Sequence, residues 1–298
     1  MNVKRSLYKR MLKMKLMPPK VVTLMDGGIC SQMHQFLLGQ LFEERGFRVS
    51  YDLSFYEEWG SDLNDAFVRN FDLLKAFPYL RMNVASKMVI DVYEHRYYYK
   101  GNNTGVREED FSFLNLTPPV YLGGYYHLPP ELWLKTFNRL FRLTSNVLDE
   151  TNETLRNEIQ QTPHTIAVHV RRGDLKEEVF AYGKPATLTY FQKAVQLFME
   201  KYAVPFFYFF SDEPGWVAQE LIPSLPLVQN YKVIDRNGSD KGYMDLFLIA
   251  SCRHQITSKG TLGKYGALLM DNPDKQVLFC NDPTEYPWKE LVYNPVFI

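Results

Sequence analysis

The sequence lacks the features of a membrane-spanning, disulfide-stabilised or secreted protein. Its most apolar run, residues 203–210, is the length of a strand, whereas a transmembrane helix needs about 18 apolar residues. Three widely spaced cysteines, Cys30, Cys252 and Cys280, are too few for a disulfide framework or a thiolate metal site. Lysines and arginines interrupt residues 1–20, which therefore lack the apolar middle of a signal peptide. We expect a cytoplasmic protein.

The sequence also lacks an excess of charge of either sign. Its 34 basic and 34 acidic residues give a formal net charge of zero, so we expect no nucleic acid partner. Seven of the basic residues and none of the acids fall in residues 1–20, which leaves the remainder with a net charge of −7. Leu7, Met11 and Met14 share a helical face among these cations. This basic tail therefore suggests peripheral contact with an anionic inner membrane, or else a solvated extension.

The hydrophobic content is high enough for a large core, and its pattern indicates an α/β protein. Short apolar strands alternate with helical segments in two blocks, which is typical of parallel sheets covered on both faces. We expect two Rossmann-like lobes with a cleft between them. The predicted divisions are the basic tail 1–20, an N-terminal lobe 21–160 and a C-terminal lobe 161–298. The predicted strands are 21–25, 47–51, 166–170, 206–210, 232–235 and 277–280, and the principal predicted helices are 31–45, 130–161 and 261–270.

A pair of glycines, Gly27 and Gly28, separates the first predicted strand from the first helix. Adjacent glycines permit close backbone approach, and the helix start behind them offers free N–H groups to an anion. The third glycine of a dinucleotide fingerprint is absent, although Asp52 lies at a plausible spacing for a ribose contact. A structural turn and a nicotinamide-dependent oxidoreductase both remain as alternative interpretations.

A second motif, from His169 to Asp174, ends an otherwise apolar strand. Its consecutive arginines, Arg171 and Arg172, form a cationic group suited to a diphosphate, because guanidinium binds phosphate bidentately. His169 interrupts a strand that we expect to be buried, where a lone histidine is more often a satisfied core residue. The arginines beside it favour a role in binding.

Two further motifs follow later strands. Ser211, Asp212 and Glu213 offer hydrogen-bond acceptors to a base or ribose, with helix capping as the structural alternative. The segment from Ser258 to Gly263 is a turn rich in hydroxyls and glycine that opens the last helix. It is a second candidate phosphate site.

Together these motifs resemble the α-1,2-fucosyltransferases of glycosyltransferase family 11, over roughly residues 21–270. Residues 169–174 match the family's H-x-R-R-G-D. Residues 211–216 resemble its S-D-D-x-x-W, and residues 252–256 with 260–263 resemble its C-x-H-x-I and G-T-F-G. Residues 27–33 and 122–126 resemble its G-G-L-G-N-Q-M and G-Y-W segments. Cys30, Ser31, Leu262 and Tyr265 depart from the common pattern.

The resemblance implies an inverting enzyme of the GT-B type that moves L-fucose from GDP-fucose to O2 of a terminal β-galactoside. The C-terminal lobe would bind GDP-fucose and the N-terminal lobe would face the glycan acceptor. It further implies a role in O-antigen or capsule biosynthesis, without a cofactor or metal. In agreement, the sequence contains no D-x-D motif of the kind that holds a divalent cation on a nucleotide sugar.

The resemblance also implies roles for individual residues. The residues expected to act in catalysis are Arg171, Arg172 and Asp174, and His34 is an alternative general base. The residues expected to bind the donor are Gly27, Gly28, Gln32, His169, Ser211, Asp212, Asp245, Ser258, Gly260 and Thr261. A non-catalytic glycan-binding protein, using the tyrosine-rich region around Tyr93 to Tyr99, is a further alternative.

Overall fold

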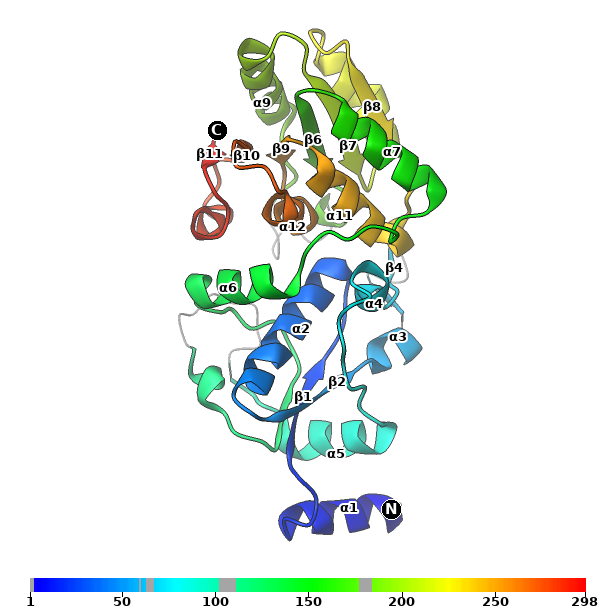
Figure 1. Ribbon diagram of the computed structural model, residues 1–298, viewed down its shortest axis with the longest axis vertical. Coiled ribbons are helices and arrows are strands. Elements are labelled where there is room, and N and C mark those ends of the chain that lie inside the picture. Colours follow the sequence, from blue (N-terminus) through cyan, green and yellow to red (C-terminus); the bar gives the residue numbers. More distant parts are fainter. Residues whose placement is uncertain (1–2, 59, 63–66, 102–110, 177–183) are drawn as a thin grey trace. The chain divides into compact units, whose positions relative to one another are not determined.

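A computed structural model describes residues 3–58, 60–62, 67–101, 111–176 and 184–298. The chain forms two compact units, Met1–Phe141 and Arg142–Ile298, each built around its own parallel sheet (Figure 1). Within the described ranges, no helix combines the length and the apolar character needed to cross a bilayer.

The first unit contains a three-stranded parallel sheet in the order β2-β1-β5. Its strands are β1 (Lys20–Leu24), β2 (Arg48–Asp52) and β5 (Val120–Leu122), and a separate antiparallel pair is formed by β3 (Ser61–Asp62) and β4 (Phe67–Val68). Its helices are α1 (Val3–Lys13), α2 (Ile29–Glu44), α3 (Ser54–Glu58), α4 (Leu73–Ala76), α5 (Lys87–Tyr97), η1 (Ser112–Asn115) and α6 (Pro130–Leu140).

The predicted strand-helix-strand at the start of this unit is confirmed in β1, α2 and β2. Val21 and Val22 of β1 are completely buried, as are Met33 and Leu37 of α2. α2 is buried on nearly all of its sides, which is the arrangement expected of a helix that is apolar all round. The basic segment before β1 forms α1, which packs on α5 and so belongs to the same unit.

The second unit is built on a six-stranded sheet in the order β11-β10-β9-β6-β7-β8, in which every pairing is parallel. The strands are β6 (Thr165–Val170), β7 (Phe206–Ser211), β8 (Tyr231–Ile234), β9 (His254–Thr257), β10 (Val277–Phe279) and β11 (Pro295–Phe297). The α-helices are α7 (Glu150–Gln161), α9 (Leu188–Lys201), α10 (Pro214–Trp216), α11 (Gly242–Ser251) and α12 (Leu262–Leu269). The short helices are η2 (Asp174–Lys176), η3 (Val217–Leu221), η4 (Ile222–Ser224), η5 (Ser239–Lys241) and η6 (Tyr286–Glu290).

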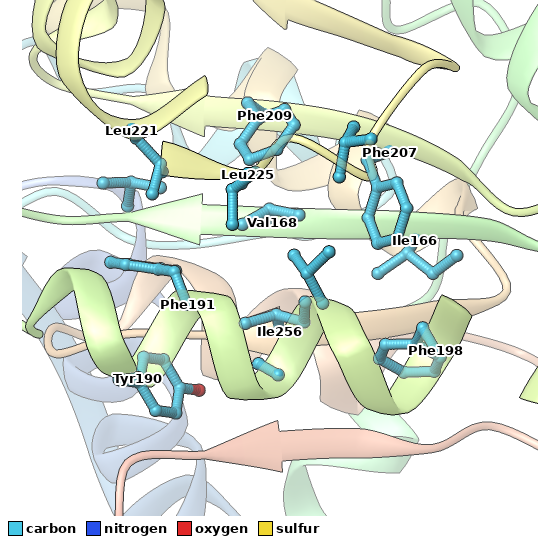
Figure 2. Close-up of a cluster of buried hydrophobic side chains, with 14 of the residues drawn as sticks. Ile166, Val168, Tyr190, Phe191, Phe198, Phe207, Phe209, Leu221, Leu225 and Ile256 are labelled. Carbon is cyan, nitrogen blue, oxygen red and sulfur yellow. The ribbon is translucent and has the colours of Figure 1, made fainter. Parts of the chain in front are cut away.

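Alternate residues of β6 face opposite sides of this sheet, as the pleat of a strand requires. Ile166 and Val168 pack on the side covered by α9, where Figure 2 shows them beside Phe191 and Phe198. Ala167 packs on the other side, with residues of α7 and α11. His169 follows Ala167 at the next position of the same face. The strand therefore presents a histidine on the side occupied by α11 and α12.

The helix predicted over residues 130–161 is instead two helices, α6 and α7, which belong to different units. The chain between them includes Asn146 with a φ of +63°, and Asp149 caps α7 by accepting the Asn152 N–H. Leu155 and Ile159 then bury α7 against the sheet of the second unit. The division between units accordingly lies earlier than the predicted boundary at residue 160.

Candidate functional site

The carboxyl ends of β6, β7 and β9 lie side by side in the sheet of the second unit. Val170 is in register with Ser211, and His169 is in register with Thr257. The residues that follow these three strands, including Arg171, Asp212 and Ser258, therefore meet at one edge. This is the place where open parallel α/β sheets bind ligands.

Asp212 supports the loop that follows β6. Its two carboxylate oxygens accept the backbone N–H groups of Arg172, at 3.0 Å, and Gly173, at 2.9 Å. The Nε of Arg171 lies 3.4 Å from the same carboxylate. Ser211 adds a bond from its hydroxyl to the Val170 carbonyl, at 2.8 Å. Both side chains, which the resemblance assigns to donor binding, hold the loop in place here.

The two adjacent arginines have different surroundings. Arg172 stacks on Trp216, with its guanidinium carbon 3.6 Å from the ring centroid, and donates from Nε to Glu213 at 3.2 Å. Although burial alone raises the pKa of Glu213, hydrogen bonds from Lys176 and Arg172 lower it overall. Arg172 is thus held by an acid and an aromatic ring. Arg171 lies at the strand ends, beside the turn that follows β9.

The turn between β9 and α12 packs directly against Arg171. The Ser258 hydroxyl accepts the Arg171 N–H at 2.8 Å, and the Ser258 N–H donates to the His169 carbonyl at 3.1 Å. Gly260 has a φ of +86°, and a Cβ there would lie 3.4 Å from the Arg171 side chain. Thr261, the N-cap residue of α12, makes no capping bond through its side chain. The start of α12 therefore receives no cap from the Thr261 side chain, a condition that favours an anion there.

His169 is buried beneath this turn and is neutral. Burial, followed by the charges of Arg171 and Lys264, lowers its pKa to about 3. Its Nδ1 has no hydrogen-bond partner among the described residues. A Cβ on Gly263 would lie 2.8 Å from this nitrogen and 2.6 Å from the Thr257 hydroxyl, so only glycine fits at that position. The ring can orient a neighbouring group through a hydrogen bond but carries no charge.

Two further residues of the second unit, Asp245 and Asp174, were predicted to act in donor binding and in catalysis. Asp245, in the first turn of α11, accepts a hydrogen bond from Asn237 at 2.8 Å, and Asn237 also bonds Asn152. Burial raises the pKa of Asp245 to about 7 despite the bond from Asn237. Asp174, the last residue of the H-x-R-R-G-D motif, begins η2, and its side chain lies outside the described part of the structure.

The predicted donor-binding residues of the first unit surround the start of α2. Gly27 has a φ of +66°, which accounts for glycine there, and Gly28 is the N-cap residue of α2. The Gln32 side chain makes four hydrogen bonds within the unit. It donates to the Gly27 and Asn70 carbonyls and accepts the N–H groups of Asp72 and Leu73. Gln32 is therefore already engaged as a link between α2 and α4.

His34 and Asp52, which sequence reasoning proposed for other roles, are also engaged within the first unit. The Nε2 of His34 lies 2.7 Å from the Tyr126 carbonyl, and its Nδ1 lies 3.2 Å from the Trp133 indole N–H. Burial lowers the pKa of His34 to about 4. Asp52 is buried and accepts the Tyr121 hydroxyl and the Ser54 N–H, each at 2.8 Å. These contacts leave neither side chain well placed as a general base or a ribose ligand.

Across the described ranges, no cluster of three or more histidines, cysteines or acids is placed to hold a metal ion. The second unit instead offers a cation, Arg171, beside the uncapped start of a helix. Those two features together suit a ligand that carries several negative charges.

A family model for glycosyl transferase family 11 matches residues 73–294, about three quarters of the chain. The chain belongs to glycosyl transferase family 11. Its two units each contain a parallel sheet flanked by helices, which confirms the predicted α/β class with two Rossmann-like lobes. A fold of the GT-B type consists of two such lobes.

Several known proteins are similar to this family 11 chain. The mouse galactoside alpha-(1,2)-fucosyltransferase 2 is 32% identical over 152 residues, which cover 49% of this chain and 41% of the mouse protein. The Escherichia coli O-antigen biosynthesis glycosyltransferase WbnK is 25% identical over 143 residues, covering 47% of this chain and 46% of WbnK. Each match therefore spans less than half of the relative. The solved fucosyltransferase NodZ from Bradyrhizobium is 14% identical over 87% of this chain and 96% of its own, with a TM-score of 0.49.

The lysines behind the β9–α12 turn were not among the residues predicted from the sequence. Lys259 and Lys264 are both buried and both paired with acids from the segment after β10. One signal was available, because Lys264 interrupts an otherwise apolar helix at an inward-facing position. The acidic partners themselves could not be found from the sequence, since the pairing depends on the path of the chain after β10.

The raised pKa of Asp245 predicts a pH-dependent stability. Between about pH 4 and pH 7 the folded state retains a proton that the unfolded state has lost, so the free energy of unfolding falls as pH rises. Asp245→Asn removes this titration but can still accept the bond from Asn237. Urea unfolding should show its stability advantage growing from near zero at pH 4 to roughly 4 kcal/mol at pH 8. The exposed Asp235→Asn is the matched control, and a pH-independent effect of Asp245→Asn would contradict the prediction.

Proposed function

We propose that this protein is an inverting galactoside α-1,2-fucosyltransferase. It transfers L-fucose from GDP-fucose to O2 of a terminal β-galactoside of a glycan. The observation that carries the proposal is the placement of Arg171 beside the uncapped start of α12 in a member of glycosyl transferase family 11. The names of the mouse and E. coli relatives support the α-1,2 linkage and a role in O-antigen or capsule biosynthesis.

In the proposed reaction, negative charge develops on the diphosphate that Arg171 and the start of α12 bind. As the acceptor O2 bonds to C1 of fucose, the bond from C1 to the β-phosphate oxygen breaks and negative charge develops on the departing GDP. Arg171 and the first amides of α12 stabilise that charge through hydrogen bonds. Ser258 and Asp212 hold Arg171 in position. His169 lies against the β9–α12 turn and Gly260 against the Arg171 side chain, and Asp245, in the first turn of α11, is a proposed donor-binding residue.

Arg172 and Asp174 have separate parts in this proposal. Arg172, held by Glu213 and Trp216, adds positive potential near the donor diphosphate and fixes the loop after β6. It does not bind the phosphate bidentately. Inversion in one displacement calls for a base near the acceptor hydroxyl, or for a transition state that needs little assistance. Asp174 is the candidate base, since both ring nitrogens of His34 are engaged. In the first unit, Gly27 and Gly28 form the turn before α2 and Gln32 lies in the first turn of that helix, and all three remain proposed donor-binding residues.

The alternative functions receive less support. A nicotinamide-dependent enzyme would need Asp52 for the ribose, and its carboxylate already accepts two hydrogen bonds within the first unit. In the tyrosine-rich region, Tyr93 is part of the buried core, which reduces the aromatic surface available to a glycan-binding protein. Binding of GDP but not of NADPH, with release of GDP from GDP-fucose only when a galactoside is present, separates the three functions.

Arg171→Ala should abolish most of the transfer activity while leaving the fold intact. A charge-assisted phosphate contact that strengthens in the transition state contributes a few kcal/mol, or roughly a hundredfold or more in kcat. Arg171→Lys should not restore activity, because an ammonium cannot reproduce the guanidinium fork. The exposed Arg253→Ala is the control. Near-normal turnover by a folded Arg171→Ala protein, with circular dichroism as the check, would overturn the assignment.

We also propose that the reaction requires no metal ion, because Arg171 and the start of α12 provide an alternative way to neutralise the diphosphate. Fucose transfer should then be unchanged by EDTA at concentrations well above those of any contaminating metal. The measurement is the rate of GDP release with and without chelator. Activity that is lost with EDTA and restored by Mn²⁺ would show that the proposal is wrong.

A further part of the proposal is that α1 contacts an anionic membrane. Tyr8 and Leu12 anchor the helix on α5, and Arg5 pairs with Asp91. Leu7, Met14 and the following Leu16 are 58–66% exposed, among lysines and arginines that attract an anionic leaflet. We therefore include Leu16 in place of Met11 in the proposed contact surface, since Met11 is half-buried.

Substitution of Leu7, Met14 and Leu16 by glutamine should weaken co-sedimentation with phosphatidylglycerol vesicles severalfold, without changing activity on soluble galactosides. High salt should weaken the binding of the unsubstituted protein as well, because it screens the cations. Leu227→Gln, an exposed leucine of the second unit, is the control. Equal sedimentation of the unsubstituted and triply substituted proteins would contradict a membrane role for α1. Substitution is preferable to deletion of α1, which would also uncover α5.

A further inference from the structure

Two lysines are buried in the segment that joins β9 to α12. Lys259 and Lys264 are each 3% exposed, and no other lysine in the described ranges is classed as buried. Lysine is almost never fully buried unless its ammonium is paired. Their burial therefore directs attention to the groups that surround them.

The partners of both lysines come from the chain after β10. The Nζ of Lys264 lies 2.6 Å from a carboxylate oxygen of Glu285, and both side chains are only 4% exposed. The same Nζ lies 5.3 Å from the centroid of the Trp288 ring. The Nζ of Lys259 lies 2.9 Å from Asp282 and 2.6 Å from the Thr284 hydroxyl. We call Asp282, Thr284, Glu285 and Trp288 the C-terminal clamp.

The clamped lysines adjoin the candidate anion site. Lys259 stands between Ser258, which accepts the Arg171 N–H, and Gly260, which packs on the Arg171 side chain. Lys264 follows Gly263, whose backbone lies against the His169 ring. The charge of Lys264 acts on that ring, since it contributes to the lowered pKa of His169. The C-terminal clamp thus contacts the buried lysines of the segment that contains the candidate anion site.

The ion pair between Lys264 and Glu285 is not an efficient way to gain stability. Removing two charges from water costs several kcal/mol per ion, and apolar side chains of similar size often replace such a pair without loss of stability. Burial lowers the pKa of Lys264, and the Glu285 carboxylate opposes this by favouring the ammonium form. Glu285 therefore keeps a cation beneath the anion-binding turn.

We propose that Lys264 and Glu285 are positioning residues for the donor diphosphate, with Lys259 and Asp282 as a second pair of the same kind. They fix the β9–α12 turn and keep a positive charge behind it, without contacting the donor. This inference rests on the proposed function, because it takes the turn to be the diphosphate site. It assigns a role to Asp282 and Glu285, which lie beyond the sequence motifs.

The experiment compares Glu285→Gln, Lys264→Met and the double variant Lys264→Met/Glu285→Leu. Each is measured for melting temperature, for GDP affinity by isothermal titration, and for the KM for GDP-fucose. The single variants should melt at lower temperature and bind GDP at least about tenfold more weakly. The double variant should regain the melting temperature of the unsubstituted protein while its GDP affinity stays about tenfold lower.

A control pair is available in the same unit. The Nζ of Lys232 lies 2.7 Å from Glu158, between β8 and α7, and both side chains are about 40% exposed. Lys232→Met/Glu158→Leu should leave the GDP affinity unchanged. Lys259→Gln provides an independent test, because its partner Asp282 is partly exposed and the variant need not lose its fold. It should raise the Kd for GDP severalfold.

The outcomes are distinguishable from those of the proposed function. If the unsubstituted protein does not bind GDP, the proposed function fails and the inference fails with it. If the unsubstituted protein binds GDP and the double variant binds it equally well, the clamp has a purely structural role and the inference alone is wrong. Should the double variant not fold, unchanged GDP affinity in Lys259→Gln would overturn the inference.

Discussion

The hydrogen bonds from the loop after β6 to the Asp212 carboxylate determine the form of the candidate site. A carboxylate that accepts two consecutive backbone N–H groups makes charge-assisted bonds, which are stronger than neutral ones. Those bonds, at 3.0 and 2.9 Å, fix the backbone of Arg172 and Gly173 to the end of β7. Ser258 fixes the backbone of Arg171 to the end of β9 in the same way. The loop is consequently held from both neighbouring strands.

This double attachment separates two arginines that are adjacent in the sequence. Consecutive residues of an extended chain point in opposite directions, and the side chains accordingly reach different neighbours. Arg172 meets Glu213 and Trp216, whereas Arg171 lies against Gly260 at the start of α12. Beneath them, His169 is kept neutral by its burial, so it adds no further charge to the site. In the proposed function, the positive potential offered to a diphosphate comes from Arg171, Arg172 and the start of α12, with the ion-paired lysines behind the turn.

Much of this arrangement was predictable, because apolar strands and the motifs at their ends leave clear local patterns. The strands β1, β6 and β7 and the joint position of Arg171 and Ser258 follow from such patterns and from the parallel topology. The break between α6 and α7 was missed, since a capping aspartate and one residue of positive φ interrupt a pattern that otherwise continues. The engagement of Gln32 and His34 could not be foreseen either. Their partners, such as Asp72 and Tyr126, are brought to them only by the folded chain.

We propose that Arg171 and the start of α12 bind the diphosphate of the donor, and a crystal structure of the protein with GDP would reveal the contacts of that diphosphate. Phosphate oxygens should lie within hydrogen-bond distance of the Arg171 guanidinium and of the amides between Gly260 and Gly263, with Arg172 still stacked on Trp216. GDP bound with its phosphates away from Arg171, or held by a metal ion on carboxylates, would contradict it.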